Sequence, residues 1–280
     1  MTPRLPAATL IAATLLAGAT PALAQTEQVI PVPGFADFLA VDGDTVWATN
    51  NGRVERWSRT GKLAEVPVAR PCGAMAVAAG SLWVANCKDR VLTRIDLATA
   101  KVVATIPTGV ANAEEGEMIV AAGDGAVWIG SGANGEIARV DPATNRVVAT
   151  VTVAPGSYFL AYGFDALWAV SQKGATIQKV DPRTNRVVAT TKLGRSPGFL
   201  VAGEGAVWVQ EQGDGTVAKI DPATGALSGR VKVDETLKYG DIDAGGGLVW
   251  LRTTDRQTFV ALDPTSLAIK ARVGRPVGSG

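Results

Sequence analysis

Tryptophan recurs along this chain at a spacing close to forty residues. Six tryptophans lie at positions 47, 83, 128, 168, 208 and 250, separated by 36, 45, 40, 40 and 42 residues. Each stands in a short apolar run, and an aspartate follows five of them after thirteen residues. These aspartates are Asp96, Asp141, Asp181, Asp221 and Asp263. A spacing held through five repeats predicts a repeated structural unit of about forty residues.

One repeat has the pattern of four short strands. In the fifth repeat, residues 199–202, 206–209 and 216–220 are apolar or alternating runs separated by turns that contain glycine. Residues 146–151 typify the fourth strand. Four antiparallel strands per forty residues are typical of a blade of a β-propeller. We therefore predict an all-β propeller with six complete four-stranded repeats, either six-bladed or seven-bladed with the last blade incomplete.

Three of the repeated aspartates begin an Asp-Pro-x-Thr motif, as in Asp141-Pro-Ala-Thr and Asp181-Pro-Arg-Thr. An aspartate at the first position of a turn accepts hydrogen bonds from the following amides, and proline presets φ for a type I turn. We therefore interpret these residues as turns between the third and fourth strands and not as metal ligands. The repeated tryptophans are expected to form the core between adjacent blades.

The first 24 residues have the features of a signal peptide. Arg4 provides a positive charge, residues 7–17 form an apolar stretch, and Ala22-Leu-Ala provides a cleavage site before Gln25. We therefore predict a signal peptide at 1–24, a propeller domain at 25–280, and a periplasmic or secreted location. No later segment has the apolar length of a membrane-spanning helix.

Charge and cysteine content narrow the possible partners and chemistry. The chain has 27 basic and 26 acidic residues, and removal of the signal peptide removes Arg4. The remaining 26 basic and 26 acidic residues give no net positive charge to attract nucleic acid. Cys72 and Cys87 flank the first two strands of the second repeat and are predicted to form a disulfide. Histidine is absent, which excludes Ser–His–Asp and Cys–His catalysis. We expect a monomer.

The repeats resemble the YVTN/YncE-like propellers and the virginiamycin B lyase-like family. The closest stretches are Gly123-Asp-Gly-Ala-Val-Trp and Arg139-Val-Asp-Pro-Ala-Thr-Asn-Arg-Val-Val-Ala-Thr, and the resemblance covers residues 28 to about 274. It implies the propeller fold, and for a lyase it implies a catalytic histidine with a bound magnesium ion. This chain has no histidine, so that residue cannot be carried over.

Departures from the repeat indicate where a ligand would bind. Function in propellers concentrates at the channel mouth, where the connections between blades and between second and third strands meet. Asp241 replaces a mostly apolar position, and Glu117 belongs to an acidic run that a solvated loop also explains. The candidate ligand-binding residues are Glu117, Tyr158, Glu211, Asp214, Tyr239, Asp241 and Arg252.

Two functions fit these residues. The first is a non-catalytic binding or scaffold module that recognises a small molecule or a protein at the channel mouth, with no cofactor. The alternative is a metal-dependent lyase or lactonase in which Glu117, Glu211, Asp214 or Asp241 would hold calcium or magnesium. We favour the first, because the chain offers no catalytic motif.

Overall fold

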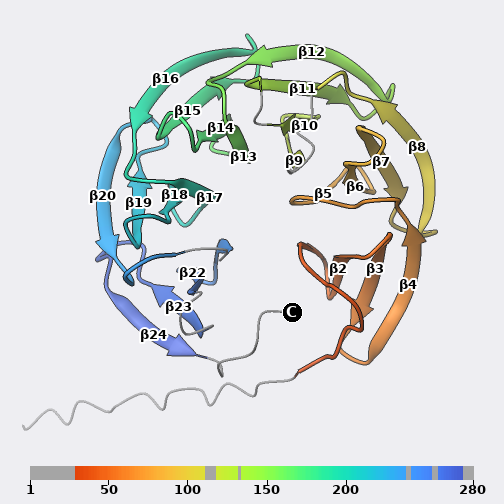
Figure 1. The fold of residues 1–280 in the computed structure, drawn as a ribbon, viewed down its shortest axis with the longest axis horizontal. Helices are drawn as coiled ribbons and strands as arrows, with labels where there is room; N and C mark the ends of the chain where they lie inside the picture. The colour runs from red at the N-terminus through yellow and green to blue at the C-terminus, as the bar shows by residue number, and fades with distance from the viewer. Residues whose placement is uncertain (1–28, 111–117, 132–133, 238–240, 254–257, 274–280) are drawn as a thin grey trace, which may run out of the picture.

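The computed structural model describes residues 29–110, 118–131, 134–237, 241–253 and 258–273. Its strands form six antiparallel sheets of four strands each, arranged as blades of a ring around a central axis (Figure 1). The strands of each blade pair in chain order, with the first innermost and the fourth outermost. The ring confirms the predicted all-β propeller, and it has six blades. Within the described ranges, no helix is long and apolar enough to cross a membrane.

The blades follow one another along the chain, and each uses four consecutive strands. Blades 1 and 2 comprise β1 (Leu39–Asp42), β2 (Thr45–Asn50), β3 (Arg53–Ser58), β4 (Gly61–Pro67), β5 (Ala76–Ala78), β6 (Ser81–Asn86), β7 (Val91–Asp96) and β8 (Lys101–Pro107). Blades 3 and 4 comprise β9 (Met118–Gly123), β10 (Ala126–Ser131), β11 (Glu136–Asp141), β12 (Arg146–Thr152), β13 (Ser157–Gly163), β14 (Ala166–Ser171), β15 (Thr176–Asp181) and β16 (Arg186–Lys192). Blades 5 and 6 comprise β17 (Pro197–Gly203), β18 (Ala206–Glu211), β19 (Thr216–Ile220), β20 (Leu227–Lys232), β21 (Ile242–Gly245), β22 (Leu248–Thr253), β23 (Thr258–Leu262) and β24 (Ile269–Val273).

The hydrophobic core lies between consecutive blades, as the tryptophan repeat predicted. Five of the six tryptophans are fully buried, and Trp250 of blade 6 is half-buried. Each lies on the second strand of its blade, and the five buried ones pack against residues of the following blade. The cluster around Trp208, for example, joins Val217 of blade 5 to Leu251 of blade 6. Burial of large aromatic and branched side chains therefore holds each blade to its neighbour.

The Asp-Pro motifs form the predicted turns. The Asp141 carboxylate accepts hydrogen bonds from the backbone N–H of Ala143 and the hydroxyl of Thr144, both at 2.8 Å. Asp181 accepts equivalent bonds from Arg183 and Thr184. These bonds favour the ionised form and lower the pKa of both carboxyl groups. The aspartates therefore fix the turns between the third and fourth strands.

A cation on the third strand joins consecutive blades, and we call this contact the blade latch. In blade 2 the Arg94 guanidinium lies 4.8 Å from the ring of Trp83 and donates to the carbonyl oxygen of Pro142 in blade 3, at 2.6 Å. In blade 5, Lys219 bonds in the same way to the carbonyl of Pro264 in blade 6. From blade 2 to blade 6, each latch ties the core tryptophan of one blade to the Asp-Pro turn of the next. Between blades 1 and 2, Arg56 lies over Trp47 and donates to the carbonyl of Leu97 in the equivalent turn.

The latch is missing where blade 6 meets blade 1, an interface that we call the seam. Ala261 is paired with Trp250 at the position of the latch cation, and the turn 58–61 of blade 1 has no Asp-Pro motif. Apolar side chains on both facing sides are exposed, with Leu39 at 62%, Val41 at 66% and Phe259 at 51%. The ring is therefore less tightly joined at the seam than between its other blades.

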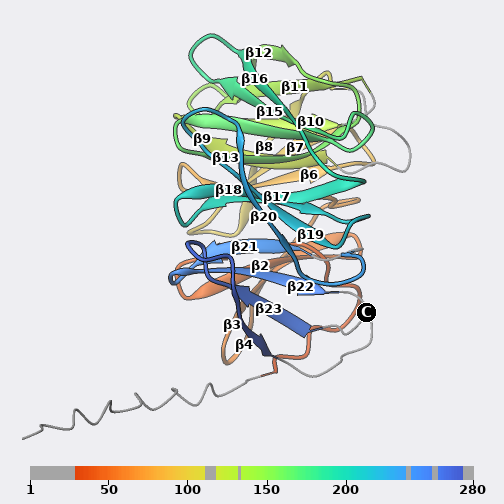
Figure 2. The same ribbon diagram turned by 90° about the vertical axis from the view of Figure 1, so that its left-hand side faces the viewer.

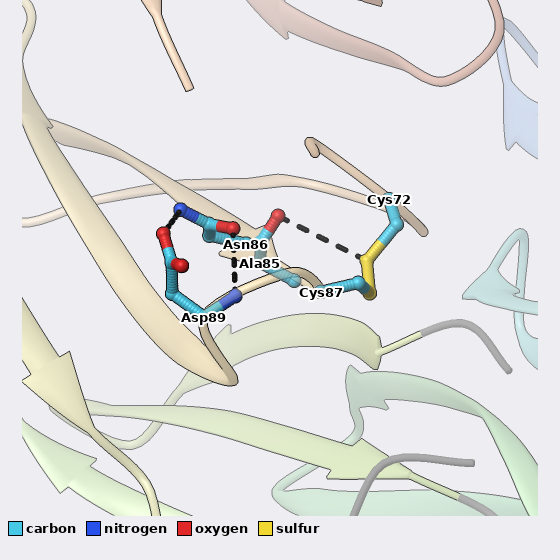
Figure 3. The surroundings of a disulfide bond; sticks show 5 residues. All are labelled: Cys72, Ala85, Asn86, Cys87 and Asp89. Carbon is cyan, nitrogen blue, oxygen red and sulfur yellow. Dashed lines mark hydrogen bonds between the residues drawn. A yellow bond between two sulfur atoms is a disulfide. The ribbon is translucent and has the colours of Figure 1, made fainter. Parts of the chain in front are cut away.

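Cys72 and Cys87 form the predicted disulfide, with their Cα atoms 6.0 Å apart. Cys72 precedes β5, and Cys87 directly follows β6 (Figure 3). The N–H of Cys72 donates to the carbonyl of Ala85, so backbone hydrogen bonding continues beyond the short inner strand. The bridge therefore fastens the start of blade 2 to the end of its second strand.

Replacing both cysteines by alanine is expected to lower the free energy of unfolding by about 2–3 kcal/mol, because the bridge restricts the unfolded chain. Urea denaturation of both proteins measures the difference. Dithiothreitol should cause the same loss in the wild type and leave the double variant unchanged. Equal urea midpoints for the oxidised wild type and the variant would contradict the prediction.

Candidate functional site

The topology gathers the candidate residues on one face of the ring. The strands of each blade cross the thickness of the ring, so that the connections lie on two opposite faces (Figure 2). Connections between blades and between second and third strands share one face, which we call the upper face. The Asp-Pro turns lie on the other. We call the inner ends of the blades on the upper face, around Asp37, Tyr158 and Asp241, the channel mouth.

Glu211 ends β18, and its fully buried side chain accepts four hydrogen bonds from three residues. Arg230 binds it through two nitrogens, at 2.6 and 2.7 Å, and the hydroxyl of Thr216 and the N–H of Gly194 complete the set. Burial alone would raise the pKa of Glu211, but these hydrogen bonds and the charge of Arg230 lower it. Glu211 therefore ties the chain entering blade 5 to the outer strand of that blade.

Asp214 lies three residues after Glu211 and holds the same linker. Its carboxylate accepts the backbone N–H of Arg195 at 2.7 Å and the Arg195 Nε at 2.6 Å. These two bonds lower the pKa of Asp214. Both carboxylates of this corner therefore already have arginine partners from the protein itself.

Asp241 directly precedes β21, the first strand of blade 6. The equivalent residues of the other blades, nine positions before each tryptophan, are Phe38, Ala74, Ile119, Phe159 and Phe199. The Asp241 side chain is exposed to solvent. The protein atoms near its carboxyl group partly desolvate that group, and this raises its pKa. One carboxylate oxygen accepts the N–H of Ile242, and no cation pairs with the side chain in the described part of the chain.

Asp37 lies across the seam from Asp241 and was missed by the sequence analysis. It precedes the inner strand of blade 1, and its negative charge further raises the pKa of Asp241. Desolvation raises the pKa of Asp37 as well. Asp37 stands ten residues before Trp47, just as Tyr158 stands ten before Trp168. Comparing these positions along the repeat would have identified it.

Aromatic side chains line the channel mouth on the side of blades 4 and 5. Tyr158 and Phe159 begin blade 4, and their rings meet edge to face at 6.4 Å. Phe159 packs on Phe199 of blade 5, with the ring centres 4.7 Å apart. Phe199 occupies in blade 5 the position of Asp241 in blade 6. All three rings are half-buried, so each offers part of its surface to a ligand.

Two side chains from second strands complete the described part of the site. Gln210 is fully buried, and its Nε2 donates to the carbonyl oxygen of Asp241 at 3.0 Å. Arg252 holds the equivalent position in blade 6, and its backbone N–H donates to the same carbonyl. No ion pair joins its guanidinium to Asp241 among the described residues. Glu117 and Tyr239 lie outside the described residues.

The described residues do not assemble a metal site. Within the ranges that the structure describes, no three His, Cys, Asp or Glu side chains are grouped closely enough to hold an ion. A cavity of ≈ 530 Å³ lies between blades 2 and 3, lined by Arg94, Asp141 and Pro142 among others. It is on the face of the Asp-Pro turns, and these polar residues belong to the latch and the turn. The channel mouth therefore remains the stronger candidate site.

The fold and the site define a class of six-bladed propellers with an inner-strand rim open to solvent. Within that class the chain has a virginiamycin B lyase-like fold. The virginiamycin B lyase of Staphylococcus aureus matches it with a TM-score of 0.74 at 17% identity, covering 88% of this chain and 86% of that one. A streptogramin B lyase matches at 0.71 and 16%, covering 87% and 84%.

A third structure bears on the chemistry. It is a catalytically inactive histidine-to-alanine variant of the Staphylococcus aureus lyase with quinupristin, at a TM-score of 0.65 and 20% identity, covering 81% of this chain and 80% of that one. No protein-family model and no curated protein sequence matches this chain. At these identities the likeness concerns the fold.

Proposed function

We propose that this protein is an exported binding module that recognises a ligand, a small molecule or a protein, at the channel mouth. The pair Asp37 and Asp241 carries the proposal. Both side chains are exposed at the mouth, the protein around them raises the pKa of each carboxyl group, and no cation pairs with either among the described residues. Ionisable groups with shifted pKa values that face a shared opening are typical of binding sites.

Export is part of the proposal. The predicted signal peptide, residues 1–24, lies outside the described residues. The Cys72–Cys87 disulfide is compatible with an oxidising compartment such as the periplasm or the extracellular space.

The likeness to streptogramin lyases favours a second function, a metal-dependent lyase or lactonase. The inactive relative named above has lost a histidine, and this chain has none among its 280 residues. Of the carboxylates that this hypothesis needs, Glu211 and Asp214 are bound by Arg230 and Arg195. Both observations support binding over catalysis.

A ligand screen tests the proposed function. Residues 25–280 and the Asp241→Asn variant are screened by thermal shift against a panel of amines, carboxylates, sugars, nucleosides, lactones and short peptides. We expect compounds that raise the melting temperature of the wild type more than that of the variant, and mass spectrometry should show them unchanged. Formation of products would overturn the proposal in favour of an enzyme, and hits indifferent to the substitution would place the site elsewhere.

A further inference from the structure

We infer that the channel mouth binds an organic cation, an ammonium or guanidinium group carried on an apolar body. The inference rests on the proposed binding function and names the class of its ligand. Three features of the described residues support it: an excess of negative charge, a buried acceptor without a donor, and neighbouring aromatic rings.

The excess of negative charge is local. On the upper face, Glu211 and Asp214 each have a cation from the protein itself, Arg230 and Arg195. Asp37 and Asp241 have none among the described residues, and their charges repel each other across the seam. A cation placed between them would turn this repulsion into two attractions.

The second feature is the side chain of Gln210. Its Nε2 bond to the carbonyl of Asp241 directs the amide toward the residue that begins blade 6. Its Oε1 is buried and has no hydrogen-bond partner among the described residues. An unpaired buried acceptor destabilises the protein, so a ligand whose donor reaches Oε1 when the mouth rearranges around it would gain affinity. An ammonium or guanidinium group carries several donors and could serve Gln210 together with a carboxylate.

The third feature is the aromatic surface. Phe199 holds in blade 5 the position that Asp241 holds in the next blade, blade 6. The ring of Phe159 packs against the ring of Phe199, with 4.7 Å between the ring centres. Both rings are half-buried. Aromatic faces attract cations and also accommodate apolar groups. The rings and the carboxylates together match a ligand with a charged head and an apolar body.

The same donor set is poor for a metal ion. Calcium takes six to eight oxygen ligands, usually with several carboxylates. The side-chain oxygens considered at the described part of the mouth are the carboxylates of Asp37 and Asp241 and the amide oxygen of Gln210. No group of three His, Cys, Asp or Glu side chains occurs there. An organic cation, which needs fewer contacts and uses the rings, suits this arrangement better.

Three probes with the same aromatic body and different charges test the inference. Isothermal titration of residues 25–280 compares phenethylamine, protonated at pH 7, with neutral 2-phenylethanol and anionic 3-phenylpropionate. We expect phenethylamine to bind at least about tenfold more tightly than either, since a charge-assisted hydrogen bond is lost with the cation. Asp241→Asn should weaken its binding about tenfold, while Asp241→Glu, which keeps the charge, should retain it.

The control is Asp44→Asn, which removes one negative charge from an exposed turn on the opposite face of blade 1. It should leave the affinity for phenethylamine unchanged. Equal binding of 2-phenylethanol, or an unaltered affinity in Asp241→Asn, would overturn the cationic ligand. Binding of calcium or magnesium chloride that depends on Asp241 and displaces phenethylamine would overturn it in favour of a metal.

The failures of the two proposals are distinguishable. If a neutral or anionic compound binds and Phe199→Ala weakens it, the cationic ligand is wrong but the channel mouth remains a binding site. If neither the three probes nor the wider panel binds, the proposed binding function fails with it.

Discussion

Replacing Arg230 by methionine is expected to lower the free energy of unfolding by about 3–4 kcal/mol, because it leaves Glu211 buried without a counter-charge. Arg230 reaches the carboxylate with two nitrogens, while Glu211 itself has no exposed surface. The hydrogen bonds from Gly194 and Thr216 would remain but carry no full charge. Urea denaturation at pH 7 measures the loss.

The matched control combines Arg230→Met with Glu211→Gln, which removes the stranded charge but keeps an acceptor for Gly194. This double variant should recover at least half of the stability lost by Arg230→Met. A loss below about 1 kcal/mol in the single variant would mean that the pair behaves as an exposed ion pair.

The blades and turns were predictable because they repeat. Five Trp–Asp spacings fixed the register of the strands, and the short distance between Cys72 and Cys87 made one bridge within blade 2 the natural pairing. The cations of the latch could also be predicted from the sequence, because each stands eleven residues after a tryptophan: Arg94, Arg139, Lys179 and Lys219. Ala261 breaks this rule, which marks the seam in the sequence itself.

The roles of the polar residues were less predictable. Glu211 was predicted as a candidate ligand-binding residue, but its partner Arg230 lies nineteen residues away on the outer strand, and no local pattern links the two. Asp37 escaped notice because the first repeat has a shorter hairpin and lacks the aspartate turn that aligns the others. Side-chain pairing depends on distances between strands, which the repeat register does not provide.

The candidate site and the seam coincide. Asp37 belongs to blade 1 and Asp241 to blade 6, so the two carboxylates, which have no cation partner among the described residues, lie on either side of the blade interface where both halves of the latch are replaced. Apolar packing between blades resists change, whereas exposed Val41 and Phe259 at the seam lack such support. A ligand binding both aspartates would therefore also join blades 1 and 6, and we expect it to stabilise the ring.

Glu55 is expected to make this protein sensitive to acid. It lies on β3 with only 1% of its side chain exposed, on the side of blade 1 that faces the seam. Four donors reach its carboxylate: Asn50 Nδ2, Arg53 Nε, Trp57 Nε1 and Lys62 Nζ. Burial alone would raise the pKa of Glu55, but these bonds lower it from 4.5 to about 2. Because the pKa is lower in the folded state, the stabilisation is present above pH 4.5 and is lost as the pH falls toward 2.

Replacing Glu55 by glutamine should therefore cost roughly 3 kcal/mol at pH 7, and the difference from the wild type should shrink toward pH 2. Urea denaturation at several pH values measures this difference, so that the contributions of other carboxylates cancel. Glu65→Gln, which alters an exposed partner of the same Lys62, should cost less than about 1 kcal/mol. A difference that stays constant between pH 7 and pH 2 would show that packing and not charge makes Glu55 stabilising.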